Sequence, residues 1–205
     1  MKNNNYLRLI ISLFLPLLLA SCAATSVTGT WKEANYNKPI KKILVIGLTK
    51  EPANRRIFED TLSQGIRDAG QEAQVSVKYF TDTKKISKET LAPIVKKENI
   101  DTVIIGRVVA VNKENQYVAS GYPSSYNSMY GYYGRVSPYY GSGGYYVENT
   151  IVSLEFNLYE TTNAKLVWAL TTETFQPGNI NKEIAKISKL IVKELTKEKL
   201  LSTPQ

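Results

Sequence analysis

The chain has 205 residues, one cysteine and no histidine, and it carries a formal net charge of +8. Without histidine it cannot build a Ser-His-Asp or Cys-His nucleophile, an HExxH zinc site or a histidine general base. The sequence also lacks the GxxxxGK[ST] and GxGxxG motifs, so no phosphate-cradling loop of these kinds is expected.

The first 21 residues form a secretory signal. Residues 1–8 are polar and carry two cations, and residues 9–20 are almost wholly apolar, which is the order of segments in a signal peptide. Twelve helical residues span about 18 Å, well short of the ~30 Å hydrocarbon core of a bilayer. We therefore expect export rather than a permanent transmembrane helix.

The segment Leu19-Ala20-Ser21-Cys22 resembles the bacterial lipoprotein box. The resemblance implies that Cys22 becomes the first residue of the mature chain, with diacylglycerol on its sulfur and an acyl chain on its amine. This covalent lipid is the expected membrane anchor, and no other cofactor or metal is expected. The alternative is an ordinary signal followed by a chance cysteine, although a lone free thiol is unusual in a secreted protein. By the same resemblance, Asp at position 23 would imply retention in the inner membrane. The residue there is Ala23, which implies the periplasmic face of the outer membrane.

After Cys22, residues 22–39 have no periodic apolar pattern and are expected to form a flexible tether. Residues 40–201 are expected to form one periplasmic α/β domain that carries an insertion at 116–147. A buried strand is predicted at 41–48, followed by a helix N-capped by Asn54 and ended by Gly70. A strand at 75–80, a helix that begins after Ser87 and a central strand at 102–111 follow.

Beyond the insertion, alternating apolar residues predict a strand over 152–158 and an antiparallel partner over 166–175. Trp168 on this partner is interpreted as a packing residue. Apolar residues from Ile180 to Leu195 line one face of a terminal helix. The predicted order is therefore β-α-β-α-β-β-β-α. It gives a mixed sheet with an antiparallel meander and a covering C-terminal helix.

The basic residues are interpreted as solvated surface. Five lysines of the terminal helix lie opposite its apolar face, with binding to anionic glycan or lipid as the alternative: Lys182, Lys186, Lys189, Lys193 and Lys197. Arg55 and Arg56 each have an acid four residues later, so two ordinary helical ion pairs are expected. Because an exported protein does not meet nucleic acid in the cell, no nucleic-acid partner is expected.

The insertion is the most distinctive surface segment. Between Tyr117 and Tyr146 it holds ten of the fourteen tyrosines, six of the twelve glycines and a single charged residue. Tyrosine combines an apolar ring with a polar hydroxyl, which suits contacts with proteins and sugars. The alternative is a low-complexity hairpin tip without a binding role. The candidate partner-binding residues are Tyr122, Tyr126, Tyr130, Tyr132, Tyr133, Arg135, Tyr139, Tyr140, Tyr145 and Tyr146.

The lipobox, the strand at 41–48, the helix with Phe58 and Leu62, and the hairpin 159–168 together resemble a broad group of small envelope lipoproteins. This group includes the curli-secretion lipoprotein and the outer-membrane activator of penicillin-binding proteins. In that hairpin Ala164 stands where the group usually has glycine. The resemblance implies a non-catalytic accessory protein on a tether that contacts another envelope protein.

Two functions from different classes remain open at this stage. The first is an anchored, non-enzymatic interaction module that binds an envelope protein complex or cell-wall glycan through the insertion. The second is a carboxylate-based hydrolase of an envelope polymer. The hydrolase requires two of four acids to share a cleft, and these acids are Asp101, Glu155, Glu160 and Glu173. The sequence leaves the oligomeric state open.

Overall fold

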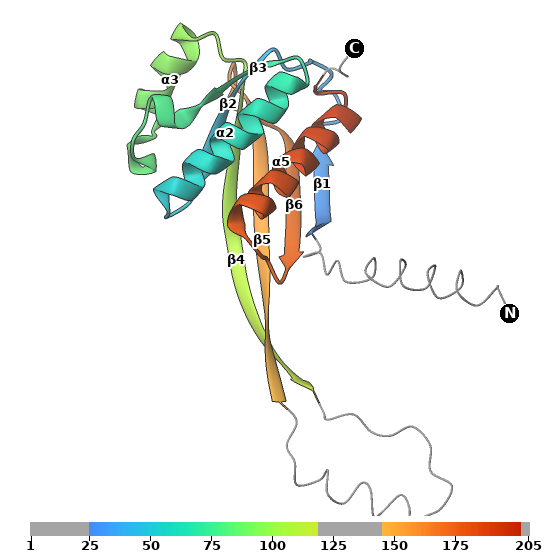
Figure 1. Ribbon diagram of the computed structural model, residues 1–205. Coiled ribbons are helices and arrows are strands. Elements are labelled where there is room, and N and C mark those ends of the chain that lie inside the picture. Colours follow the sequence, from blue (N-terminus) through green and yellow to red (C-terminus); the bar gives the residue numbers. More distant parts are fainter. Residues whose placement is uncertain (1–24, 119–144, 202–205) are drawn as a thin grey trace, which may run out of the picture.

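A mixed sheet with the strand order β1-β6-β5-β4-β2-β3 organises the chain (Figure 1). The computed structural model describes residues 25–118 and 145–201. The strands are β1 (Thr25–Lys32), β2 (Lys42–Leu48), β3 (Glu72–Val75), β4 (Thr102–Val118), β5 (Tyr145–Glu160) and β6 (Leu166–Phe175). The helices are α2 (Pro52–Asp68), α3 (Lys88–Lys97) and α5 (Ile180–Lys197), with short 3-10 turns η2 (Ser76–Lys78) and η3 (Thr83–Lys85).

The sheet is parallel at one side and antiparallel at the other. Strand β2 pairs in parallel with both β3 and β4, so α2 and α3 are the two crossover helices. Strands β4, β5, β6 and β1 then pair antiparallel. The predicted fold class is confirmed, and so is the predicted order of elements from β2 to α5. One strand, β1, precedes that order.

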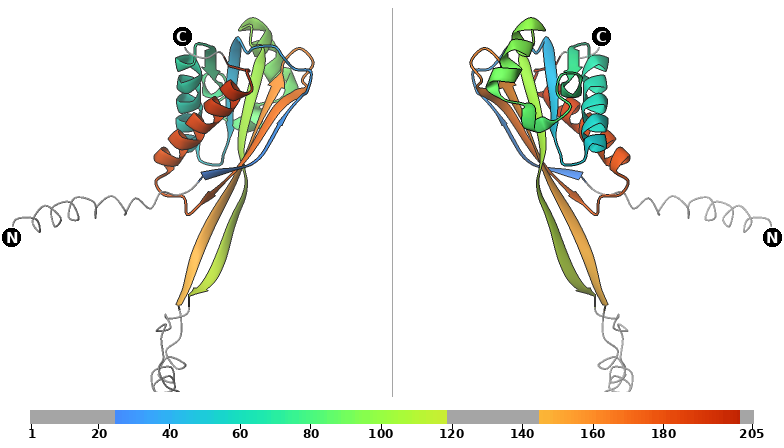
Figure 2. Two further views of the ribbon diagram at one scale, coloured as in Figure 1. Left: turned by 90° about the vertical axis from the view of Figure 1, so that its right-hand side faces the viewer. Right: turned by 90° about the vertical axis from the view of Figure 1, so that its left-hand side faces the viewer.

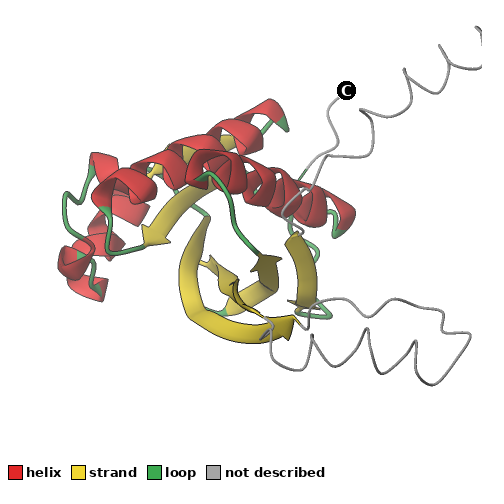
Figure 3. Ribbon diagram, turned by 60° about the horizontal axis from the view of Figure 1, so that its bottom comes forward, coloured by secondary structure: helices red, strands yellow, loops and turns green. Residues whose placement is uncertain are grey.

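Helices α2 and α5 lie together on one face of the sheet, and α3 lies on the opposite face near β2 (Figure 2). The larger core lies under α2 and α5, where Trp168, Leu62 and Ile191 are fully buried. A smaller core under α3 includes Leu44 and Ile46. Seen from the end where β4 and β5 project, the sheet curves beneath the helices (Figure 3). Trp168 is thus a core residue, as predicted.

The flexible tether expected over 22–39 is wrong at residues 25–32. Residues 25–32 form β1, which pairs antiparallel with β6 from Thr25 opposite Thr174 to Lys32 opposite Trp168. Further along, Tyr36 and Ile40 are buried in the core. The segment lacks apolar alternation, but β6 offers it a free edge of backbone hydrogen-bonding groups. Tertiary pairing therefore decides its structure.

Two other local predictions are wrong. Helix α2 begins at Pro52 after Glu51, so Asn54 is not its cap. Proline suits the first helical position because its missing N–H has no helical partner there. The strand expected at 75–80 instead ends at Val75 and is followed by η2. By contrast, Gly70 has a left-handed φ of 88° just beyond α2, and Ser87 forms a capping box with Thr90, both as predicted.

Candidate functional site

Most residues singled out by the sequence lie outside the described part of the chain. Cys22 precedes the first described residue, and eight of the ten insertion residues lie between 119 and 144. The other two, Tyr145 and Tyr146, begin β5 and stand opposite the last two residues of β4. The structure therefore describes the two strands that border the candidate site, β4 and β5.

The candidate site is bordered by a two-stranded ribbon, residues 113–118 of β4 and 145–150 of β5 (Figure 1). Strand β2 ends at Leu48, opposite Arg107, and β6 ends at Phe175, opposite Ile151. The six remaining pairs of β4 and β5 continue without a third strand beside them among the described residues, a projection of roughly 20 Å at about 3.4 Å per residue. The expected insertion boundaries, 116 and 147, therefore lie inside these strands.

The base of the ribbon is braced by Gln176, the residue after β6. Its backbone N–H donates to the Thr150 carbonyl at 2.8 Å. Its side-chain Nε2 donates to the Glu148 carbonyl at 3.0 Å and to Asn149 Oδ1 at 2.8 Å. Across the ribbon, Lys113 Nζ pairs with Glu148 Oε1 at 2.7 Å. These contacts fix the direction in which the ribbon leaves the sheet.

One row of the sheet joins the start of β1 to the base of the ribbon. Thr25 stands opposite Thr174, Thr174 opposite Val152, and Val152 opposite Val111. The two threonine hydroxyls are hydrogen-bonded at 3.0 Å. The segment that leads to Cys22 and the ribbon that carries the insertion therefore leave from the same end of the sheet.

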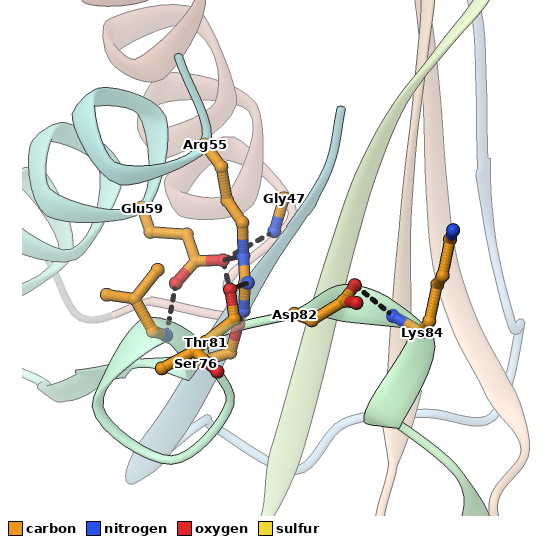
Figure 4. Close-up of polar contacts among 8 residues, drawn as sticks. Gly47, Arg55, Glu59, Ser76, Thr81, Asp82 and Lys84 are labelled. Carbon is orange, nitrogen blue, oxygen red and sulfur yellow. Dashed lines mark hydrogen bonds and ion pairs between the residues drawn. The ribbon is translucent and has the colours of Figure 1, made fainter. Parts of the chain in front are cut away.

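A buried ion pair lies near the N-terminus of α2 (Figure 4). Arg55 Nε donates to Glu59 Oε1 at 2.9 Å, and Ser76 Oγ donates to the same oxygen at 2.7 Å. Backbone N–H groups of Gly47 and Val77 also donate to the Glu59 carboxylate, at 3.0 and 2.9 Å. The sequence predicted an ordinary pair here, and nothing in the spacing of Arg55 and Glu59 showed that it would be buried.

The Glu59 carboxylate therefore ties α2 to the end of β2 and to η2. A buried carboxylate needs several donors to offset its lost hydration, and Glu59 has four. The same contacts explain why residues 76–78 leave the sheet, because Ser76 turns inward to Glu59. We assign this cluster a structural role.

An apolar pocket of about 290 Å³ opens between the N-terminal ends of α2 and α5 and the sheet beneath them. Its inner wall contains Phe58 and Phe156, which stack with ring centroids 5.9 Å apart. Its outer wall includes Val108 and Ile180, which are 46% and 49% exposed. No sequence pattern predicted this pocket, because its walls come from six separate elements, β2, α2, β4, β5, β6 and α5.

The four carboxylates proposed for a hydrolase are held by other groups or exposed. Asp101 accepts the backbone N–H groups of Lys41 and Lys42 at 2.8 and 3.1 Å, and Glu173 is exposed on β6. Hydrogen bonds from Asn157 and Arg107 lower the pKa of Glu155, and Lys38 lowers the pKa of Glu160.

A general acid at neutral pH needs a raised pKa instead. None of these contacts therefore favours the hydrolase alternative. Among residues 25–118 and 145–201, no group of three or more acidic, cysteine or histidine side chains is placed to hold a metal ion.

The five lysines of α5 are exposed, as predicted. Two of them pair with acids one turn earlier on the same helix, Lys186 with Glu183 at 3.1 Å and Lys197 with Glu194 at 3.2 Å. Local pairing of this kind is ordinary for a solvated helix face.

No protein-family model matches the chain, and no curated protein matches it. Among solved structures, the PelC dodecamer from Paraburkholderia phytofirmans aligns at 15% identity over 87% of this chain and 99% of that one, with a TM-score of 0.48. Lipoprotein GNA1162 from Neisseria meningitidis aligns at 14% identity over 77% and 99%, with a TM-score of 0.41. A PDZ domain protein from Parabacteroides distasonis gives 10% identity over 96% and 41%, with a TM-score of 0.38.

The neighbours thus include one protein described as a lipoprotein, and all identities are low. At identities of 15% or less, the function of the chain has to be inferred from its own residues. Within the described residues, no helix has the length and apolar character needed to cross a bilayer.

Proposed function

We propose that this protein is a lipid-anchored lipoprotein of the bacterial envelope that acts as a non-catalytic interaction module. The observation that carries the proposal is the projecting β4–β5 ribbon, whose end at Val118 and Tyr145 borders the tyrosine- and glycine-rich sequence 119–144. Bracing by Gln176 supports a presenting role, because a braced ribbon loses less conformational freedom when a partner binds.

The anchor end of the domain supports a partner close to the membrane. Two alanines separate Cys22 from Thr25, so these residues span at most about 10 Å. Because β1 starts at the same end of the sheet as the ribbon, an anchor on Cys22 directs the ribbon toward the membrane surface. We therefore propose an envelope protein complex at this surface as the partner, with cell-wall glycan as the alternative, and the outer membrane as the site.

The free edge of β4 offers the partner a second surface. Beyond Arg107, no described strand pairs with β4 on its β2 side, and Val109 and Val111 on this stretch are 50% and 56% exposed. An unpaired strand edge with apolar side chains can accept an extended segment of another protein. Both surfaces support an interaction function rather than catalysis.

Site-specific photo-crosslinking in cells tests the proposal. A photoreactive amino acid at position 126 or 133 of the full-length protein is expected to give a discrete product, identified by mass spectrometry as an envelope protein or a glycan adduct. Lys189, exposed on α5, is the control position. Replacement of residues 119–144 by Asn-Gly, which closes a two-residue hairpin, tests the segment itself.

In the variant with Asn-Gly in place of residues 119–144, a photoreactive amino acid at position 113 on the ribbon reports whether the partner is still captured. Its crosslinked product is expected to disappear while the melting temperature of the protein is unchanged. The interaction function is wrong if the loop positions and position 189 give the same products, or if the shortened protein captures its partner as before.

A further inference from the structure

The apolar pocket between α2 and α5 lies next to the first described residue of the chain. Thr174 lines the pocket and is hydrogen-bonded through its hydroxyl to that of Thr25. Val152, the next residue along the same row of the sheet, also lines the pocket. The chain that comes from Cys22 therefore enters the domain beside the pocket.

The pocket has the shape and chemistry of an acyl-chain site. Its volume of about 290 Å³ is near the lower end of the range for small-molecule pockets, and its lining is mostly apolar. The inner end is closed where Phe58 packs over Gly47 and Gly106. The outer end is flanked by Leu48, Val108 and Ile180, all large apolar side chains that are 39–49% exposed.

The wall of the pocket also contains polar residues, and one of them is a buried carboxylate. Glu183 lines the pocket and is 4% exposed. Its Oε1 pairs with Lys186, whereas its Oε2 accepts no hydrogen bond from the described residues. A buried acceptor without a donor is costly, so a ligand with an N–H group beside an apolar chain suits the pocket better than a plain hydrocarbon. An amide-linked acyl chain has both features.

We propose that this pocket binds one of the acyl chains carried by Cys22. The inference rests on the proposed function in one respect, that Cys22 is lipidated. With at most about 10 Å of backbone between Cys22 and Thr25, the chain lies within reach of the pocket mouth. Tethering gives it an effective concentration of the millimolar order, which favours it over free lipid. The remaining acyl chains stay in the bilayer and hold this end of the domain against it.

The test uses the full-length protein made in cells supplied with a palmitate analogue that carries a diazirine and an alkyne. Mass spectrometry of the N-terminal peptide first reports whether Cys22 carries the analogue. After irradiation, the expected result is a crosslink between the Cys22-borne chain and peptides that contain Val152, Leu154 or Ile184. Crosslinks from a lipidated Cys22 confined to bilayer lipids or to other surfaces overturn the pocket proposal and leave the anchor intact.

Two variants sharpen the result. Val152→Trp fills the pocket, and the crosslink is expected to fall to background with the far-ultraviolet circular dichroism unchanged. Val109→Trp is the matched control, because Val109 is exposed on the neighbouring strand and does not line this pocket, and it is expected to leave the crosslink unchanged. Equal crosslinking in all three proteins contradicts the proposal.

A third variant distinguishes the source of the lipid. In Cys22→Ala behind a cleavable secretory signal, the pocket is expected to remain unlabelled. If it is labelled as in the wild type, the pocket binds a free lipid and the proposal is wrong. If the wild-type N-terminal peptide carries no lipid at all, the proposed anchor fails, and the proposed acyl chain fails with it.

Discussion

Arg55 and Glu59 form a buried ion pair one turn apart on α2, with side chains 4% and 0% exposed. On the same helix, Arg56 and Asp60 form the equivalent pair in solvent, 3.6 Å apart and 71% and 52% exposed. In both pairs the acid follows the arginine by four residues, and the two pairs lie one position apart in the sequence. Burial alone therefore separates their energetic roles.

We expect Glu59→Ala to destabilise the domain by about 3–5 kcal/mol, because it leaves the Arg55 guanidinium buried without its carboxylate partner. Asp60→Ala is the matched control and is expected to change the free energy of unfolding by less than about 0.5 kcal/mol. Urea unfolding followed by circular dichroism measures both. Similar losses in the two variants would show that the Arg55 site is solvated.

Gly106 lies opposite Gly47 in the register of β4 and β2, and a Cβ at Gly106 would lie 2.8 Å from Phe58 and 2.9 Å from Phe156. We expect Gly106→Ala to lower the free energy of unfolding by about 1–3 kcal/mol through overpacking. The double variant with Phe58→Leu should recover part of this loss, since it removes one of the clashes. If the stability losses of the two single variants simply add up in the double variant, as measured by thermal unfolding, position 106 and Phe58 are not in direct contact.

Ala164, in the turn between β5 and β6, has a left-handed φ of 56°. This conformation costs a non-glycine residue about 1–2 kcal/mol, whereas glycine adopts it freely but loses more entropy on folding. We expect Ala164→Gly to raise stability by about 0.5–1 kcal/mol. Ala169→Gly, inside β6, is the control and should lower it, so a loss in both variants would refute the assignment of strain.

Burial, with the charges of Glu160 and Asp101, raises the pKa of Tyr36 to about 12 from 10.0. The phenol stays neutral in the folded state at a pH where it ionises in the unfolded state. Its contribution to stability is therefore complete below about pH 10 and is lost between pH 10 and 12. We expect Tyr36→Phe to show a shallower loss of stability over this interval, measured by urea unfolding at several pH values. An unchanged slope would mean that Tyr36 ionises freely.

Patterns that depend on the nearest residues predicted the fold well. The apolar run of β2, the helical spacing of α2 and α5, and the alternation in β5 and β6 all gave the correct elements, since burial of one face sets each of these periods. The capping box at Ser87 is equally local. Together these signals were sufficient for the α/β class.

Features that depend on distant partners were missed. Strand β1 forms because β6 has a free edge, and η2 replaces a strand because Ser76 turns to Glu59. The apolar pocket and the shared row of Thr25 and Val111 also follow from register between strands. The register between two strands leaves no periodic pattern in the sequence of either strand. The sequence could name the tyrosine-rich insertion as a candidate surface but not the ribbon that presents it.

The position of β1 in the sheet also determines when this strand can pair during synthesis of the chain. Thr25 pairs with a residue 149 positions later, and closing so long a loop is entropically slow. Since synthesis begins at the amino terminus, β1 is made first but can join the sheet only after β6 exists. Until then residues 25–32 have no strand to pair with. Strand β1 therefore cannot pair until most of the domain has been made.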